Sequence, residues 1–168
     1  SKAVKPPFVF EEDDLRLLRP GQWLNDQCIE FWWDCVAQIS PEIQESENGI
    51  IFVCPSAMHM LNFLDAKELD MLNELKLDKK DMILMPVNDN QSDSAGGSHW
   101  TLLCYVRRDN LFRYYDSHGT MNLAHATRAA KKISSKIGAE KPKFETETST
   151  AQQINGTDCG LHMLLNAE

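Results

Sequence analysis

The middle of the chain reads HWTLLCYVRRDNLFRYYD from His99 to Asp116. Two apolar runs of strand length, 99–106 and 111–116, flank four polar residues, so this stretch predicts an antiparallel hairpin. Because side chains alternate between the faces of a strand, a four-residue connection places His99 on the same face as Asp116 and His118. In that register His118 lies opposite His99 and Asp116 lies diagonally, while a small slip or twist brings Asp116 alongside.

Helical patterns surround this hairpin. Apolar residues recur at helical spacing from Asn25 or Asp26, either of which can cap a helix, as far as Ser40. Further helices are expected over 55–64, 66–75 and 123–136 and from Asp158, and further strands over 50–54, 82–87 and 144–148. Helices first, then a small mostly antiparallel sheet, then two helices predict an α+β fold.

Length, charge and cysteine content limit the possible classes of protein. The chain has 168 residues, which favours a single domain over residues 1–168. A formal charge of −8 without a block of basic residues argues against a nucleic-acid partner. No apolar run approaches the roughly 18 residues of a membrane span. The five cysteines have neither disulfide nor zinc-site spacing, which indicates a reducing compartment, the cytoplasm and/or nucleus.

Cys159 stands apart from the other cysteines. It follows an Asn155-Gly156 turn at a predicted helix start, where unpaired backbone N–H groups favour a thiolate. The side-chain amide of Gln153 and the backbone N–H of Cys159 can stabilise an oxyanion. The remaining four are expected as small buried residues, in the first helix (Cys28, Cys35) and in strands (Cys54, Cys104).

The hairpin adds a candidate acid–base pair. A carboxylate that is hydrogen-bonded to one ring nitrogen fixes the imidazole tautomer and raises its basicity, as general acid–base catalysis requires. The alternative is a surface His99 and a turn Asp116 with no relation to each other.

Four motifs agree in order and spacing with one family. They are Trp23-Leu24-Asn25-Asp26, His99-Trp100, Tyr115-Asp116-Ser117, and Gln153 with Cys159-Gly160. This pattern resembles the ubiquitin-like-protein-specific cysteine proteases, the sentrin-protease family related to the adenovirus protease. It implies a papain-like/adenovirus-protease-like fold, with the sheet flanked by helices. The long loop before His99, with Gly96 and Gly97, is most similar to the deneddylase branch, because the SUMO-directed branch usually lacks it.

The resemblance implies roles for seven residues. Cys159 would be the nucleophile, His99 the general base and acid, Asp116 the orienting carboxylate and Gln153 the oxyanion donor, with no metal and no organic cofactor. Trp23, Asp26 and Trp100 would line the channel for a Gly-Gly tail, which a narrow tunnel recognises by excluding any Cβ. Asp26 has an alternative role as the helix N-cap, and Trp23 as a hydrophobic staple for that helix.

The implied function is cleavage after the C-terminal Gly-Gly of a ubiquitin-like modifier, in precursor processing and isopeptide deconjugation, with deneddylation favoured. The expected partners are the modifier and its protein conjugates, and a monomer is expected. Two alternatives remain: the same fold acting on SUMO or ubiquitin, or a modifier-binding module with poor turnover. The second arises because only residues 161–168 follow Gly160, whereas family members usually continue with further helices, so the catalytic domain looks short at its C-terminus.

Overall fold

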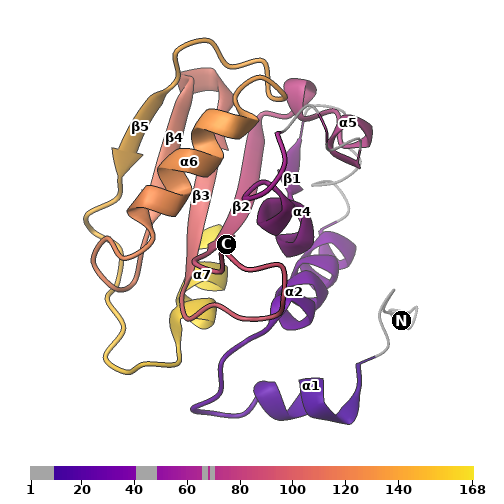
Figure 1. Ribbon diagram of the computed structural model, residues 1–168, viewed down its shortest axis with the longest axis vertical. Coiled ribbons are helices and arrows are strands. Elements are labelled where there is room, and N and C mark those ends of the chain that lie inside the picture. Colours follow the sequence, from indigo (N-terminus) through magenta and orange to yellow (C-terminus); the bar gives the residue numbers. More distant parts are fainter. Residues whose placement is uncertain (1–9, 41–48, 66–67, 69–70) are drawn as a thin grey trace.

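The chain forms a five-stranded sheet with helices on both faces (Figure 1). The computed structural model describes residues 10–40, 49–65, 68 and 71–168. The strands, in their order across the sheet, are β1 (Ile50–Phe52), β2 (Met82–Asn88), β3 (Trp100–Val106), β4 (Leu111–Tyr115) and β5 (Lys143–Thr146). The expected α+β fold is confirmed.

The sheet is mixed, with antiparallel pairing at its centre and parallel pairing at both edges. β2–β3 and β3–β4 are antiparallel and form the longer ladders, whereas β1–β2 and β4–β5 are parallel. In the β3–β4 hairpin Val106 pairs with Leu111, as the four-residue connection predicts. Extended past the ladder, this register places His99 opposite His118. The chain reverses through Asn110, which adopts the left-handed region at φ 46°.

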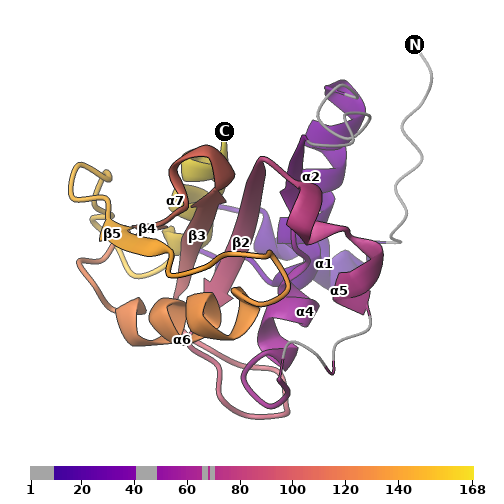
Figure 2. The ribbon, with the colours of Figure 1, turned by 90° about the horizontal axis from the view of Figure 1, so that it is seen from above.

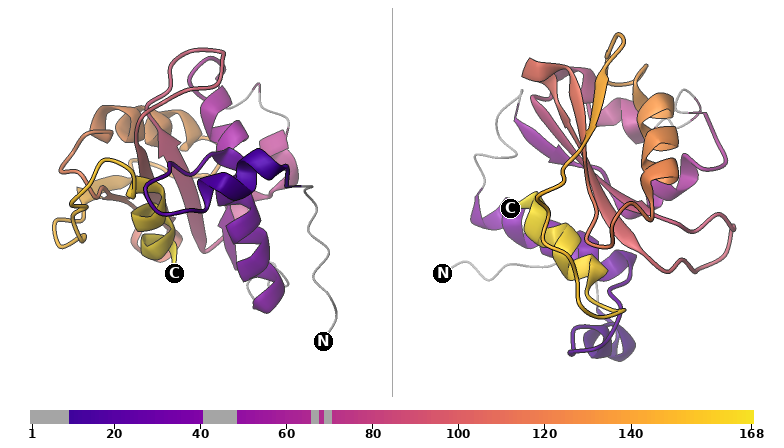
Figure 3. Two further views of the ribbon diagram at one scale, coloured as in Figure 1. Left: turned by 90° about the horizontal axis from the view of Figure 1, so that it is seen from below. Right: turned by 90° about the vertical axis from the view of Figure 1, so that its left-hand side faces the viewer.

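Two helices lie on each face of the sheet. Their bounds are α2 (Asp26–Ile39) and α7 (Cys159–Ala167) on one face, and α4 (Pro55–Met60) and α6 (Leu123–Ile133) on the other (Figures 2 and 3). Four short helices complete the described fold: α1 (Glu12–Leu17), α5 (Met71–Glu74) and the 3-10 helices Leu77–Lys79 and Arg107–Asp109. None of the helices described is long and apolar enough to cross a membrane.

Several predicted boundaries need correction. α4 and α6 end earlier than predicted, and α1 was not predicted. The helix predicted over 66–75 falls partly on residues 66–67 and 69–70, which lie outside the described residues, and α5 is the part of it that the structure describes.

Alternation along β3 divides the apolar residues between two cores. Leu103 and Tyr105 pack with Ile133 of α6 and with residues of α4. Leu102 and Cys104 pack instead with side chains of α2 and α7. Separate cores therefore bury the two faces of the sheet. Residues from both faces come close to each other at the end of the sheet where β3 begins.

Candidate active site

His99 and Asp116 form a buried pair at that end of the sheet. His99 immediately precedes β3 and Asp116 immediately follows β4, and His99 Nε2 lies 2.6 Å from Asp116 Oδ1. The side chains are 2% and 1% exposed, so this is a buried ion pair and not an accidental surface contact. The His118 ring lies edge-on to the His99 ring, with 5.9 Å between the ring centroids. Both neighbours that the register allowed are thus adjacent to His99.

Asp116 accepts hydrogen bonds at both carboxylate oxygens. Oδ1 accepts the backbone N–H of His118 at 2.8 Å in addition to His99. Oδ2 accepts the Tyr114 hydroxyl at 2.5 Å and the backbone N–H of Asn122 at 3.2 Å. Burial raises the pKa of Asp116, but these hydrogen bonds outweigh burial and hold the pKa well below its usual value.

Cys159 approaches the same point from the opposite face, as the first residue of α7. Its side chain is buried. Burial raises the pKa of the thiol, but interaction with His99 and the backbone N–H groups of Trp100 and Gly160 lower it below its ordinary value. Burial lowers the pKa of His99, but interaction with Asp116 and Cys159 outweighs burial and raises that pKa to about 9. The two shifts together favour a thiolate beside an imidazolium.

The segment before Cys159 is organised by its own side chains. Asn155 Oδ1 accepts the backbone N–H groups of Thr157 and Asp158, both at 3.0 Å, which forms a tight turn. Ser117 donates to Gln153 Oε1 at 2.7 Å, and Gln153 Nε2 donates to the Asn155 carbonyl at 2.7 Å. Since Nε2 carries two hydrogens, one remains for a further acceptor.

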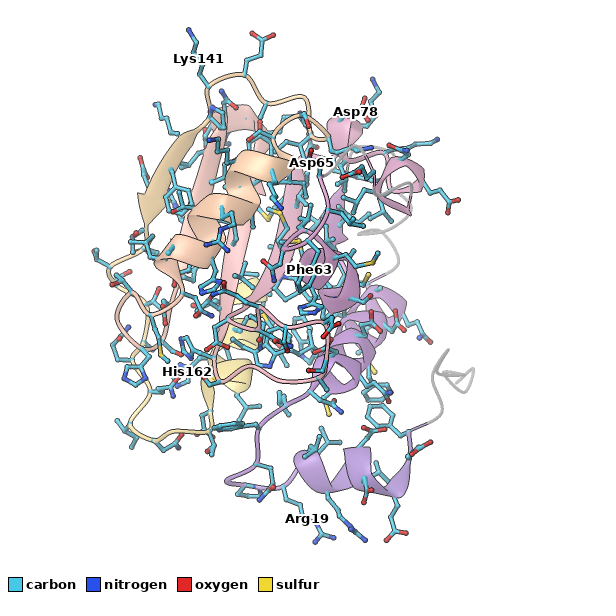
Figure 4. The ribbon with its side chains drawn as sticks, in the orientation of Figure 1. Arg19, Phe63, Asp65, Asp78, Lys141 and His162 are labelled. Carbon is cyan, nitrogen blue, oxygen red and sulfur yellow. The ribbon has the colours of Figure 1, made fainter. Side chains whose placement is uncertain are left out.

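A cavity of about 650 Å³ leads to Cys159 and His99. Trp23, Asp26 and Trp100 line it together with the loop 93–98, with Met58, His59 and Asn62 of the α4 region, and with His125 and Ala129 of α6. Figure 4 labels Phe63, which follows α4 along the chain. The residue before it, Asn62, donates its side-chain amide to the Asn90 carbonyl at 2.9 Å. All three predicted tail-binding residues therefore line the same cavity as Cys159.

The two tryptophans connect separate parts of the cavity wall. Trp23 is half-exposed, and its Nε1 donates to the Gly156 carbonyl at 2.7 Å in the turn before Cys159. Trp100 is buried, and its Nε1 donates to the Leu24 carbonyl at 2.9 Å. Each indole thus attaches the segment before α2 to a part of the site, so Trp23 is not only a staple for that helix.

Asn25, not Asp26, caps helix α2. Its side chain accepts the backbone N–H of Cys28 at 3.0 Å, and Asp26 is the first helical residue. The alternative of Asp26 as the N-cap is therefore wrong, and its carboxylate borders the cavity. Burial raises the pKa of Asp26 above its ordinary value, against the opposing effect of the nearby His59.

The glycine-bearing loop before His99 is closed at its base by Asp89. Its carboxylate accepts from the Ser98 hydroxyl at 2.5 Å, from the Ser98 backbone N–H at 2.6 Å and from the His99 N–H at 3.1 Å. Gly97 adopts φ 97°, and an added Cβ would lie 1.8 Å from Asn88 Oδ1. Glycine is required at this position for both reasons.

The other cysteines differ in their surroundings. Cys28 and Cys104 are buried, and burial raises the pKa of the Cys104 thiol to about 11. Cys54 does not lie in a strand as predicted: it precedes α4, half-buried, with its sulfur 3.2 Å from the Ser56 hydroxyl. Cys35 is also only half-buried. Within the described residues no group of three or more His, Cys, Asp or Glu side chains is arranged to hold a metal ion.

Sequence reasoning missed three residues that shape the site. Tyr114 and Asn122 hold Asp116, and Asp89 holds the backbone of His99. Tyr114 had a usable signal, because it lies two positions before Asp116 in a strand and therefore on the same face. Asn122 and Asp89 had none, since their partners are brought near only by the folded chain.

A buried thiol beside an imidazole–carboxylate pair, at the end of a cavity, defines the site of a cysteine peptidase. Residues 22–168 match the C-terminal catalytic domain of the Ulp1 protease family. The chain is 34% identical to Sentrin-specific protease 8 of Rattus norvegicus, over 95% of this chain and 74% of that protein. It is 33% identical to NEDD8-specific protease 1 of Arabidopsis thaliana, over 95% and 70% of the two chains.

A solved structure agrees with these relatives. The C-terminal Ulp1 protease domain in complex with Smt3, the yeast ortholog of SUMO, is similar with a TM-score of 0.69 and 25% identity, over 92% of this chain and 68% of that chain. The chain belongs to the Ulp1 protease family and is a cysteine peptidase. The resemblance found in the sequence motifs is thereby confirmed.

Proposed function

We propose that this cysteine peptidase cleaves after the C-terminal Gly-Gly of a ubiquitin-like modifier, and that NEDD8 is the preferred modifier. The observation that carries the proposal is one cavity lined by Trp23 and Trp100 together with His99 and Cys159. A tail without side chains can be recognised only by close walls, which flat indoles provide. Relatives named for NEDD8 at about one-third identity support the choice of modifier. The site of action, the cytoplasm and/or nucleus, stays a prediction.

The proposed reaction uses the four predicted residues in sequence. The Cys159 thiolate attacks the carbonyl carbon of the last glycine, and the Cys159 N–H and the Gln153 amide stabilise the oxyanion. The His99 imidazolium, held by Asp116, gives its proton to the departing amine, which leaves a thioester. Neutral His99 then takes a proton from a water molecule, whose oxygen attacks the thioester carbonyl. The C–S bond breaks, which releases the modifier with a free C-terminal carboxyl group and restores the Cys159 thiolate and the His99 imidazolium.

A SUMO-directed enzyme is the second candidate. The Ulp1 domain bound to Smt3 has the same fold, and this similarity favours that reading. The loop before His99 is the feature on which the NEDD8 assignment depends, because the SUMO-directed branch usually lacks it. Asn90 and residues 93–98 of this loop line the cavity.

Vinyl-sulfone probes built on NEDD8, SUMO and ubiquitin test the choice directly. We expect the NEDD8 probe to form the Cys159 adduct at least about tenfold faster than the other two, with Cys159→Ser as the unreactive control. Faster adduct formation with SUMO would refute the modifier and leave the peptidase standing.

A second variant tests the tail channel separately from the outer surface. Trp100→Ala removes a wall that every Gly-Gly tail would use, so kcat/KM should fall for all accepted modifiers together. Substitutions in the loop from Asn90 to Ser94 should instead change the ratio between modifiers. An effect of Trp100→Ala confined to one modifier would refute the shared channel.

A further inference from the structure

The Tyr114 hydroxyl lies in the apolar layer between the sheet and α6. The side chain is fully buried in the core that includes Ala126 and Ile133 of α6. Its hydroxyl is 2.5 Å from Asp116 Oδ2 and 3.1 Å from the backbone nitrogen of Asn122. A buried hydroxyl needs partners, and both of these lie at the base of the candidate site.

The direction of the hydrogen bond between Tyr114 and Asp116 is fixed by its neighbours. An ionised carboxylate can only accept, so the Tyr114 hydroxyl must donate to Oδ2. The Asn122 N–H is shared between two acceptors, since its nitrogen lies 3.1 Å from the tyrosine oxygen and 3.2 Å from Asp116 Oδ2. Burial and the adjacent carboxylate both raise the pKa of Tyr114, so the hydroxyl keeps its proton throughout the working range.

The two carboxylate oxygens of Asp116 therefore have different hydrogen-bond partners. Oδ2 is held by Tyr114 and the Asn122 N–H, while Oδ1 faces His99. The carboxylate cannot rotate about its Cβ–Cγ bond without losing the charge-assisted bond from Tyr114. We propose that Tyr114 is a positioning residue, which fixes the rotation of the Asp116 carboxylate and so the orientation of the His99 ring. The proposal rests on the proposed roles of His99 and Asp116 and does not depend on the choice of modifier.

Asn122 supplies the second support of the same arrangement. It is fully buried, and its side-chain amide donates to the His99 carbonyl at 2.8 Å and to the Val87 carbonyl at 3.4 Å. Its backbone N–H meanwhile reaches Asp116. Asn122 thus anchors both the backbone of His99 and the carboxylate of Asp116. The Tyr114 hydroxyl is the contact with Asp116 that a conservative substitution can remove.

Tyr114→Phe deletes only that hydroxyl, and Tyr105→Phe is the matched control. Tyr105 is equally buried in the sheet, but its hydroxyl bonds Asn110 Oδ1 at 2.9 Å in the hairpin connection, away from the site. In modifier cleavage, Tyr114→Phe should lower kcat about tenfold with KM within about twofold, as expected for a group that acts on the chemical step. Tyr105→Phe should leave kcat unchanged. An unchanged kcat in Tyr114→Phe would overturn the proposal.

A double-mutant cycle separates positioning from general support of the fold. If Tyr114 acts through the Asp116 carboxylate, adding Tyr114→Phe to Asp116→Asn should lower the rate less than about twofold further. An equal loss in both backgrounds would assign Tyr114 a structural role and refute the proposal. The same cycle can be read without any modifier, from the rate at which iodoacetamide alkylates Cys159, followed by mass spectrometry of that peptide. A parent that cleaves no modifier would refute the proposed function, and the alkylation cycle would still decide the role of Tyr114.

Discussion

The His99–Asp116 pair and the segment that carries Cys159 meet in one cavity, but they are held by contacts of very different range. His99 bonds Asp116 17 positions away, and the amide that holds the His99 carbonyl comes from 23 positions away. Asn155 instead organises its turn with partners two and three positions away. The base is therefore placed by packing of the whole sheet, and the turn before the nucleophile by local hydrogen bonds. Changes near the base should affect stability and activity together, whereas changes in the turn should affect activity alone.

The largest effect should come from Cys159→Ser. An alcohol beside this imidazole lacks the acidity of a thiol, so turnover should fall more than about a thousandfold while the modifier still binds. Thermal melting should change little, because the new hydroxyl keeps polar partners in His99 and in the backbone N–H groups of Trp100 and Gly160.

Cys104→Ser is the matched control for this change. It places a hydroxyl in the core between the sheet and α7, so it should lower the free energy of unfolding by about 1–3 kcal/mol with turnover per folded molecule unchanged. Comparison of adduct formation and melting for the two variants decides between them. Loss of adduct formation in Cys104→Ser without a change in melting would contradict the assignment of the nucleophile.

The next largest effect should appear in the pH dependence of kcat/KM, which reports on the His99–Asp116 pair. Activity should rise as the pH passes the lowered pKa of Cys159, and should fall about tenfold per unit above a pH of about 9, where His99 loses its proton. Because Asp116 helps to raise the His99 pKa, Asp116→Asn should move the alkaline limb to lower pH.

The same ionisation contributes to stability. The pKa of His99 is raised from 6.5 to about 9 on folding, so the contribution is complete below pH 6.5 and is lost as the pH rises to about 9. In the pH profile of kcat/KM, an alkaline limb that does not move in Asp116→Asn would show that the carboxylate does not raise the pKa of His99.

Asn155→Ala tests the local character of the turn before Cys159. The variant removes the acceptor for the Thr157 and Asp158 N–H groups, so kcat should fall about tenfold through loss of the Cys159 position. The side chain is exposed, so the melting temperature should stay within about 2 °C of the parent. A loss of stability as large as that of Cys104→Ser would contradict the contrast between the two regions.

The smallest effect should come from two glycines next to the nucleophile. An added Cβ at Gly160 would lie 3.0 Å from Leu24 Cβ, whereas one at Gly156 meets nothing within 4 Å. Gly160→Ala should displace Leu24, whose carbonyl holds Trp100, and lower kcat/KM a few-fold, with stability within about 1 kcal/mol because alanine favours the helix. Gly156→Ala should match the parent. Equal activity in both variants would show that contact with Leu24 does not set the cavity wall.

Much of the fold was predictable because it depends on local patterns. The β3–β4 register follows from four residues between two apolar runs, and α2 ends at Ile39, just before Ser40-Pro41 as expected. The parallel edges were not predictable in this way, since the pairing of β1 with β2 and of β4 with β5 joins segments separated by helices.

The sequence by itself determined which side chains are available for the chemistry. It placed Asn155, Gln153 and Cys159 within seven positions of one another, close enough for a turn and a helix start to organise them. Period-two alternation also put His99 and Asp116 on one face of a hairpin. The tertiary structure alone decided that the pair is buried, that Tyr114 and Asn122 hold the carboxylate, and that Cys159 reaches His99 from the opposite face of the sheet. The physical reason is range: alternation and turns act over a few residues, whereas burial and these hydrogen bonds arise only when distant segments pack together.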